Sequence, residues 1–213
     1  MDVGNNTENS AADHLILEYC PNIVNMANIQ RLTEVRFDRN TSFQKGTGRN
    51  RMLIAGSQGP TLLSIPILGG RSHHQLFGET RIDHRLPWKR HHLRSLTSNY
   101  GRSPYWEHYQ DELMKLYEPE ISLLFDWNLH LLAFFARLLC PNTQIKTNGT
   151  ASFGSGSRLY SVDAPQNKLI PAYQQVFATK TGFLNNLSVI DLLLNLGHPR
   201  ARLYLENLVK TAC

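Results

Sequence analysis

Two different spacings of apolar residues follow one another near the start of the chain. Residues 14–20 (HLILEYC) form a short apolar run that ends at Pro21, which predicts a buried strand. Asn22 can cap a helix over residues 23–30, where apolar positions recur at helical spacing. Residues 34–38 (EVRFD) alternate between polar and apolar and predict a second strand. A strand, a short helix and a strand in so short a stretch favour a parallel sheet.

The rest of the chain has the pattern of a hairpin followed by helices. Residues 52–55 and 61–68 are strand-like, and the turn GSQGP at 56–60 joins them as a β-hairpin. Residues 79–83 and 170–177 are also strand-like. Helices are predicted over residues 87–100, 104–117, 119–139, 187–196 and 199–210. We therefore predict an α/β fold, with a mostly parallel sheet, flanking helices and an added β-hairpin in a single domain.

Composition sets the expected limits of that domain. Residues 1–13 are polar, so we predict a disordered tail and one α/β domain over residues 14–213. The tail has no apolar stretch of the kind that a secretion signal needs. The longest apolar run, residues 121–139, is interrupted by Asp126, Asn128, His130 and Arg137, which predicts a core helix and no membrane span.

The cysteines point to a reducing compartment. Cys20, Cys140 and Cys213 form no Cys-x-x-Cys pair, and an odd number without framework spacing predicts free thiols. A cytoplasmic location follows from this expectation. Cys20 ends the predicted first strand, where a nucleophilic thiol is conceivable, but a buried structural cysteine is the favoured interpretation.

Positive charge is concentrated in one segment. The chain carries a net charge of +5, and residues 71–102 alone contain seven Lys or Arg against two acids, together with five of the nine histidines. A positive field confined to one segment suits an anionic ligand. An equally weighted interpretation is a solvated helix face flanked by core aromatic residues. The first interpretation predicts an anionic partner, and no membrane partner is expected.

Several short motifs bear on the chemistry. The loop of residues 42–51 places Lys45, Arg49 and Arg51 near flexible glycines, and Asn50 between the arginines has no obvious local partner. Residues 149–157 have two glycines at the spacing of a phosphate loop but lack the Lys-Ser/Thr that should follow, so we predict a flexible loop over 147–157. Asp191 lies inside an apolar helix, where a carboxylate is usually paired.

Metal binding is not predicted. The pairs at 73–74 and 91–92 place neighbouring histidines on different sides of a helix, and no zinc spacing appears. A site made of Asp83, His84 and either His91 or His92 stays open as an alternative. A single imidazole that transfers a proton is favoured.

Separated motifs resemble the WbqC-like family. They are Tyr19–Ile23, Phe43–Lys45, Arg49–Arg51, Arg81–Asp83, Trp88, His92, Ser95, Tyr100, Ser103–Tyr105, Tyr109, Tyr173–Phe177, Gly182–Leu184, Asn186–Leu193 and Asn195. The departures are Gly48 in place of an aromatic residue, Asn185 in place of proline, His198 inserted before Pro199, and a shorter region at 147–170. The resemblance implies a protein encoded with bacterial surface-polysaccharide clusters, which modifies sugars in O-antigen-type synthesis.

These observations combine into one hypothesis for a site at the carboxyl end of the first strand. The substrate-binding residues are predicted to be Asn22, Lys45, Arg49, Asn50, Arg51, Trp88 and Tyr100, with His92 and Asp191 as the catalytic residues. In this hypothesis Arg49 and Arg51 hold an anion and Trp88 stacks on a sugar or base. His92 acts as general base, and Asp191 or Asp83 orients it.

The predicted function is therefore a transferase that acts on a phosphate-bearing sugar or aminosugar. The expected partner is an anionic small molecule such as a nucleotide-sugar, and the sequence identifies no cofactor. The alternative is a non-catalytic binder of nucleic acid or of an acidic carrier protein through the basic aromatic segment 81–109, with Trp88, Tyr100, Tyr105 and Trp106 available for stacking.

Overall fold

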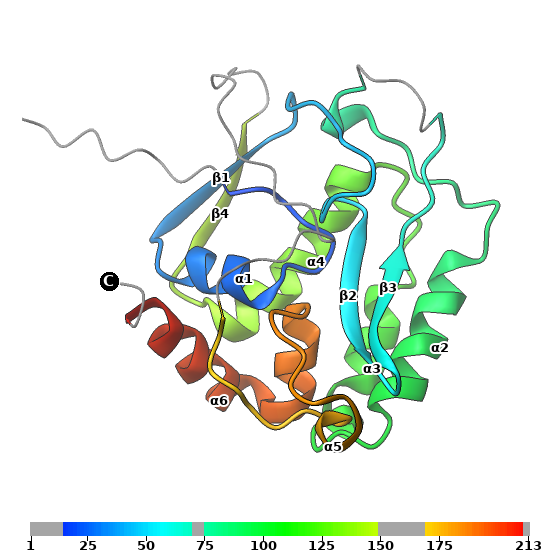
Figure 1. Ribbon diagram of the computed structural model, residues 1–213. Coiled ribbons are helices and arrows are strands. Elements are labelled where there is room, and N and C mark those ends of the chain that lie inside the picture. Colours follow the sequence, from blue (N-terminus) through cyan, green and yellow to red (C-terminus); the bar gives the residue numbers. More distant parts are fainter. Residues whose placement is uncertain (1–14, 70–74, 149–168, 211–213) are drawn as a thin grey trace, which may run out of the picture.

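The computed structural model describes residues 15–69, 75–148 and 169–210 (Figure 1). The predicted tail, residues 1–13, and most of the predicted loop at 147–157 lie outside these ranges. In chain order the elements are α1 (Ile23–Gln30), β1 (Glu34–Asp38), β2 (Arg51–Gly56), β3 (Gly59–Ser64), the 3-10 helix η1 (Phe77–Glu79), α2 (Trp88–Tyr100), α3 (Trp106–Leu116), α4 (Leu124–Leu139), β4 (Gln144–Asn148), α5 (Ala178–Thr181) and α6 (Val189–Lys210).

The strands form two small sheets, which stand apart (Figure 1). β1 pairs with β4 in parallel, from Glu34 opposite Gln144 to Asp38 opposite Asn148. β2 pairs with β3 as an antiparallel hairpin, from Arg51 opposite Ser64 to Gly56 opposite Gly59. The α/β class and the hairpin are confirmed. The mostly parallel sheet is confirmed only in part, because the described parallel sheet has two strands and the antiparallel one is equally large.

The prediction of a first strand at 14–20 was wrong for the residues that the structure describes. Residues 15–20 cross the core as an extended and then bent segment, which we call the entry segment, with Leu17, Tyr19 and Cys20 buried. The backbone of Cys20 has φ 54° and lies in the left-handed region, which ends any strand geometry. An apolar run shows that a segment is buried, but it does not show whether neighbouring backbone is available to pair with it.

The partner of β1 also differs from the expectation. β4 has the sequence QIKTN, and Gln144, Lys146 and Thr147 are exposed while Ile145 is half-buried. A short polar strand at a sheet edge gives almost no hydrophobic signal. Residues 79–83, which we predicted as a strand, contribute only isolated bridges at Arg81 and Ile82, and residues 170–177 form irregular backbone and a turn instead of the predicted strand.

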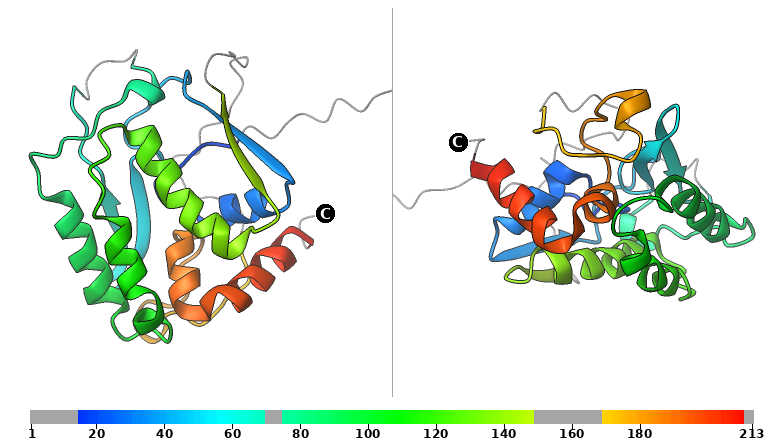
Figure 2. Two further views of the ribbon diagram at one scale, coloured as in Figure 1. Left: turned by 180° about the vertical axis from the view of Figure 1, so that it is seen from behind. Right: turned by 90° about the horizontal axis from the view of Figure 1, so that it is seen from below.

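Helices build most of the core. α4 buries residues such as Phe125, Trp127, Leu131 and Phe135, and it begins at Leu124, five residues after the predicted start. α1 and α4 both pack against α6. Gly197 has φ 70° and breaks α6 into two halves that run in different directions (Figure 2), which confirms the break predicted from Gly197 and Pro199. In the described part of the chain, no helix combines the length and apolar character that crossing a bilayer requires.

Candidate functional site

A buried carboxyl group lies on the entry segment. Glu18 is 3% exposed, and its Oε2 accepts hydrogen bonds from the backbone N–H and the side-chain Nδ2 of Asn22, both at 3.1 Å. Asn22 also caps α1, since its Oδ1 accepts from the backbone N–H of Asn25 at 2.9 Å. Burial raises the pKa of Glu18 from its ordinary 4.5 to about 7, against the opposing effect of hydrogen bonds from the Asn25 side chain and the Asn22 backbone. The carboxyl group therefore titrates near neutral pH.

Gly48 brings the arginine loop against this carboxyl group. The backbone N–H of Tyr19 donates to the carbonyl oxygen of Gly48 at 2.7 Å. A Cβ atom at position 48 would lie 2.5 Å from Oε1 of Glu18, closer than real Cβ atoms approach other atoms. A larger residue at position 48 would therefore have to displace the Glu18 side chain, and the close approach places Arg49 next along the chain from the contact.

Arg49 is a buried cation without a carboxylate partner among the described residues. It is 3% exposed, its Nη2 donates to Oγ1 of Thr41 at 3.1 Å, and its Nη1 donates to the carbonyl oxygen of Ser42. The guanidinium carbon lies 4.6 Å from the centre of the Phe77 ring, while Nε has no partner. Burial lowers the pKa of Arg49 to about 10, so the side chain is still charged at neutral pH.

The other predicted residues of this loop hold it together or face solvent. Asn50 does have local partners, because its Oδ1 accepts from the backbone N–H of Gly46 and its Nδ2 donates to the carbonyl oxygen of Ile65, both at 3.2 Å. Arg51 is half-buried and folds over Gly46, with its Nη1 3.4 Å from the carbonyl oxygen. Lys45 is exposed.

A second group surrounds His92 on α2. Nδ1 of His92 lies 2.7 Å from the hydroxyl oxygen of Tyr19, which lies 2.6 Å from the hydroxyl oxygen of Tyr117. The ring also hydrogen-bonds the backbone of Ser64, and burial lowers its pKa from 6.5 to about 4. The imidazole is therefore neutral at pH 7. Sequence reasoning placed Tyr19 in a motif but missed its hydroxyl as the partner of His92.

Trp88 is packed into the core beside His92. Its ring meets those of His92 and Trp127 edge to face, with centroids 5.2 Å and 5.1 Å away, and the side chain is 4% exposed. Tyr117 also contacts it, at 6.2 Å between centroids. Neighbouring aromatic rings thus already surround the indole that we predicted to stack on a ligand.

A third group surrounds Asp191 in the first half of α6. Tyr100 donates its hydroxyl hydrogen to Oδ1 of Asp191 at 2.8 Å and accepts from the backbone N–H of Ala55 at 2.9 Å. Tyr173 and Gln175 donate to Oδ2, the latter at 3.1 Å. Burial raises the pKa of Asp191 in spite of these donors. The network joins α2, β2, α6 and the segment before α5.

The predicted orientation of His92 by a carboxylate is corrected by these contacts. Asp191 bonds tyrosine and glutamine side chains, and Asp83 pairs with Arg85 at 2.7 Å near the surface. The partner of His92 is Tyr19. The predicted side chains thus form three groups, around Glu18 and Arg49, around His92, and around Asp191. Their convergence on a single ligand stays a prediction.

Metal and thiol chemistry find little support in the described residues. No group of three or more His, Cys, Asp or Glu side chains within 15–69, 75–148 and 169–210 is arranged to hold a metal ion. Cys20 and Cys140 are free and buried, and burial raises the pKa of each thiol to about 12. A protonated thiol is a poor nucleophile. The favoured interpretation of Cys20, a structural residue, agrees with this.

The group around Glu18 and Arg49 is the one best suited to binding a ligand and transferring a proton. Glu18 and Arg49 are both buried and carry groups of opposite charge type. The two segments that contribute them are hydrogen-bonded at Gly48. The two side chains do not form an ion pair with each other. Sequence reasoning missed Glu18, although it is the single acid within the apolar run at 14–20. An acid inside an otherwise apolar run was the available signal.

Comparison with known proteins gives one identification. Residues 18–160 match the family model described as the WbqC-like protein family. No curated protein and no solved structure gave a match to the chain.

Proposed function

Because the chain belongs to the WbqC-like protein family, we propose that it is a transferase-type enzyme of bacterial surface-polysaccharide synthesis. Its substrate is a phosphate-bearing sugar or aminosugar, such as a nucleotide-sugar. The free thiols Cys20 and Cys140 favour the cytoplasm as its location.

The observation that carries this proposal is the unpaired, buried charge of Arg49. Removing a guanidinium from water costs roughly several kcal/mol of solvation free energy. A nearby anion can offset this cost. Arg49 receives only a hydroxyl oxygen, a backbone carbonyl oxygen and an aromatic face from the described protein. Its free Nε–H belongs to the edge of the guanidinium that binds phosphate with two parallel hydrogen bonds. A phosphate group of the substrate therefore supplies the missing negative charge.

Glu18 is the group best suited to transfer a proton in this site. Its carboxyl group has a pKa of about 7, so both protonation states are populated at physiological pH. Transfer to a sugar hydroxyl or amine requires a base that removes a proton as the new bond forms. The predicted catalytic roles of His92 and Asp191 stay predictions, but both side chains are engaged by protein partners, and His92 is neutral with a pKa of about 4.

The alternative of a nucleic-acid binder is disfavoured by the burial of its stacking residues. Trp88, Tyr100 and Trp106 are 4%, 0% and 5% exposed, and Tyr105 is half-buried. Binding of single-stranded nucleic acid relies on exposed aromatic faces for sequence-tolerant stacking. The basic segment therefore offers charge but no stacking platform.

Calorimetric titration with UDP, UDP-glucose and UDP-N-acetylglucosamine tests the anion site. We expect the Arg49→Gln variant to bind about tenfold or more weakly, since a hydrogen-bonded charge pair contributes about 1.5–3 kcal/mol. Arg49→Lys keeps the charge but loses the paired hydrogen bonds, so it should be intermediate. Arg200→Gln, at an exposed arginine of α6, is the matched control.

A second measurement separates binding from chemistry. Glu18→Gln should keep nucleotide-sugar affinity within about threefold, since the amide replaces a protonated carboxyl of the same shape. It should abolish release of nucleoside diphosphate, followed by ³¹P NMR in the presence of candidate sugar acceptors. Equal binding by wild type, Arg49→Gln and Arg200→Gln would show attraction by net charge alone and would refute the proposed site.

A further inference from the structure

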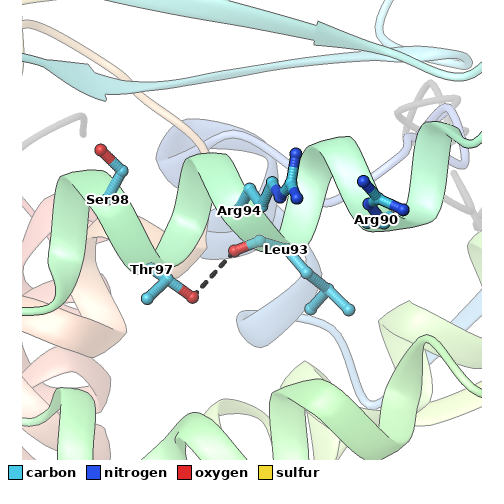
Figure 3. A pocket seen from close by; sticks show the side chains of 5 residues that line it. All are labelled: Arg90, Leu93, Arg94, Thr97 and Ser98. Carbon is cyan, nitrogen blue, oxygen red and sulfur yellow. Dashed lines mark hydrogen bonds between the residues drawn. The ribbon is translucent and has the colours of Figure 1, made fainter.

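No other described helix or strand covers the outer face of α2. The helix buries Trp88, His92, Leu96 and Tyr100, four residues apart along one side. On another side of the helix, five residues line a shallow space of about 590 Å³ that is largely open to solvent (Figure 3): Arg90, Leu93, Arg94, Thr97 and Ser98. All of these except the half-buried Leu93 are exposed. We call this set of five residues the α2 surface.

The two arginines of the α2 surface are not neutralised by the described protein. The side chains of Arg90 and Arg94 have neither a salt bridge nor a hydrogen bond within the described ranges. They are one helical turn apart, about 6 Å along the axis, and Figure 3 shows them on successive turns. Their neighbour Lys89 differs, because its ammonium donates to the carbonyl oxygen of Pro119 at 2.5 Å and lies 5.0 Å from the Trp127 ring.

We propose that the α2 surface is a docking site for an acidic amphipathic helix of a partner protein. Two carboxylates one turn apart on that helix pair with Arg90 and Arg94, and an apolar side chain between them rests on Leu93. Residues four apart on a helix have the same axial spacing on both partners. Arginine beside an apolar contact is also the composition typical of the centre of protein interfaces.

The apolar part of the α2 surface favours a protein over a nucleic acid. Leu93 and the methyl group of Thr97 lie on the side of the helix that faces away from the hairpin (Figure 3), and a phosphate backbone would gain nothing by covering this apolar surface. Nucleic-acid binding needs a longer run of phosphate contacts or exposed stacking rings. The nearest tryptophan on α2, Trp88, is buried.

Fluorescence anisotropy with defined probes tests this docking site. The probe is a labelled helical peptide with two glutamates four residues apart and a leucine between them, and its controls are the same peptide with glutamines and a single-stranded 20-mer oligonucleotide. We expect Arg90→Glu and Arg94→Glu each to weaken peptide binding about tenfold, because an attraction becomes a repulsion. Leu93→Ser should weaken it about fivefold, and the exposed control Arg200→Glu less than twofold.

The outcomes separate this inference from the proposed enzyme activity. Nucleotide-sugar binding should be unchanged in Arg90→Glu and Arg94→Glu, because neither residue belongs to the Glu18 and Arg49 group. Undetectable peptide binding to wild type, or equal binding by wild type and both variants, would overturn the docking site. So would tight oligonucleotide binding that depends on Arg90 and Arg94 when the glutamate peptide does not bind.

Discussion

Replacement of Glu18 by glutamine should change how the stability of the protein depends on pH. The carboxyl group is 3% exposed and has a pKa of about 7 in the folded protein, against an ordinary value of 4.5. Between these two values the folded state binds more protons than the unfolded state. The free energy of unfolding must therefore fall as the pH rises from 4.5 to 7.

The magnitude follows from the displacement of the pKa. Each tenfold change in proton affinity corresponds to about 1.4 kcal/mol. The raised pKa of Glu18 therefore lowers the free energy of unfolding by about 3 kcal/mol once the carboxylate is ionised in the folded state. Glutamine is neutral at every pH and has a similar shape. Glu18→Gln should thus have nearly wild-type stability at pH 4.5 and exceed it by about 3 kcal/mol at pH 8.

The wild-type profile by itself would hide this effect. Burial lowers the pKa of His92 from 6.5 to about 4, so there the unfolded state binds more protons and stability rises with pH over that window. The two trends have opposite signs and overlap. The informative quantity is therefore the difference between wild type and Glu18→Gln, in which the contribution of His92 cancels.

Urea denaturation at five pH values between 4.5 and 8.5, followed by circular dichroism, measures this difference. Glu118→Gln is the matched control, since Glu118 is exposed and its side chain has no partner among the described residues. The control should differ from wild type by less than about 0.5 kcal/mol at each pH. A difference between wild type and Glu18→Gln that stays constant with pH would refute the reasoning, because it would mean that the carboxyl group is hydrated.

Three further predictions rest on the same contacts. Gly48→Ala should destabilise the protein by about 1–3 kcal/mol in urea denaturation, because its Cβ atom would meet the Glu18 carboxyl group at 2.5 Å; wild-type stability would show that the loop can move away. Tyr100→Phe should cost about 2–4 kcal/mol, because it leaves the buried N–H of Ala55 without an acceptor and removes a donor from a buried carboxylate; a loss below about 1 kcal/mol would contradict the buried network. The imidazole resonances of His92, assigned by comparison with His92→Asn, should not titrate between pH 5.5 and 8 in NMR spectra, whereas a midpoint near 6.5 would indicate a solvated ring.

Elements whose geometry is encoded by adjacent residues could be predicted from the sequence. Asn22 caps α1 through the backbone of Asn25, three residues away, and the hairpin of β2 and β3 closes around a short polar turn. Gly197 breaks α6 because its own backbone adopts a left-handed conformation that other residues resist. Such local preferences act without reference to distant segments.

The strands and the site depended on distant segments. The apolar run at 14–20 correctly indicated burial. Its backbone hydrogen-bonds the carbonyl oxygen of Gly48 through Tyr19 and does not pair with a strand in the described residues. β4 is too polar and too exposed to be recognised, and only its pairing with β1 makes it a strand. Pairing of this kind depends on which chains the fold brings together, and the local sequence does not record it.

The same division holds for the chemistry. The sequence by itself determined the residue types, the concentration of cations before residue 102, the helix that carries Arg90 and Arg94, and the family motifs. Only the tertiary structure decided that Glu18 and Arg49 are buried beside Gly48, while Arg90 and Arg94 are exposed to water. The physical reason is that the charge of a side chain is fixed by its own atoms, whereas its solvation is fixed by what surrounds it.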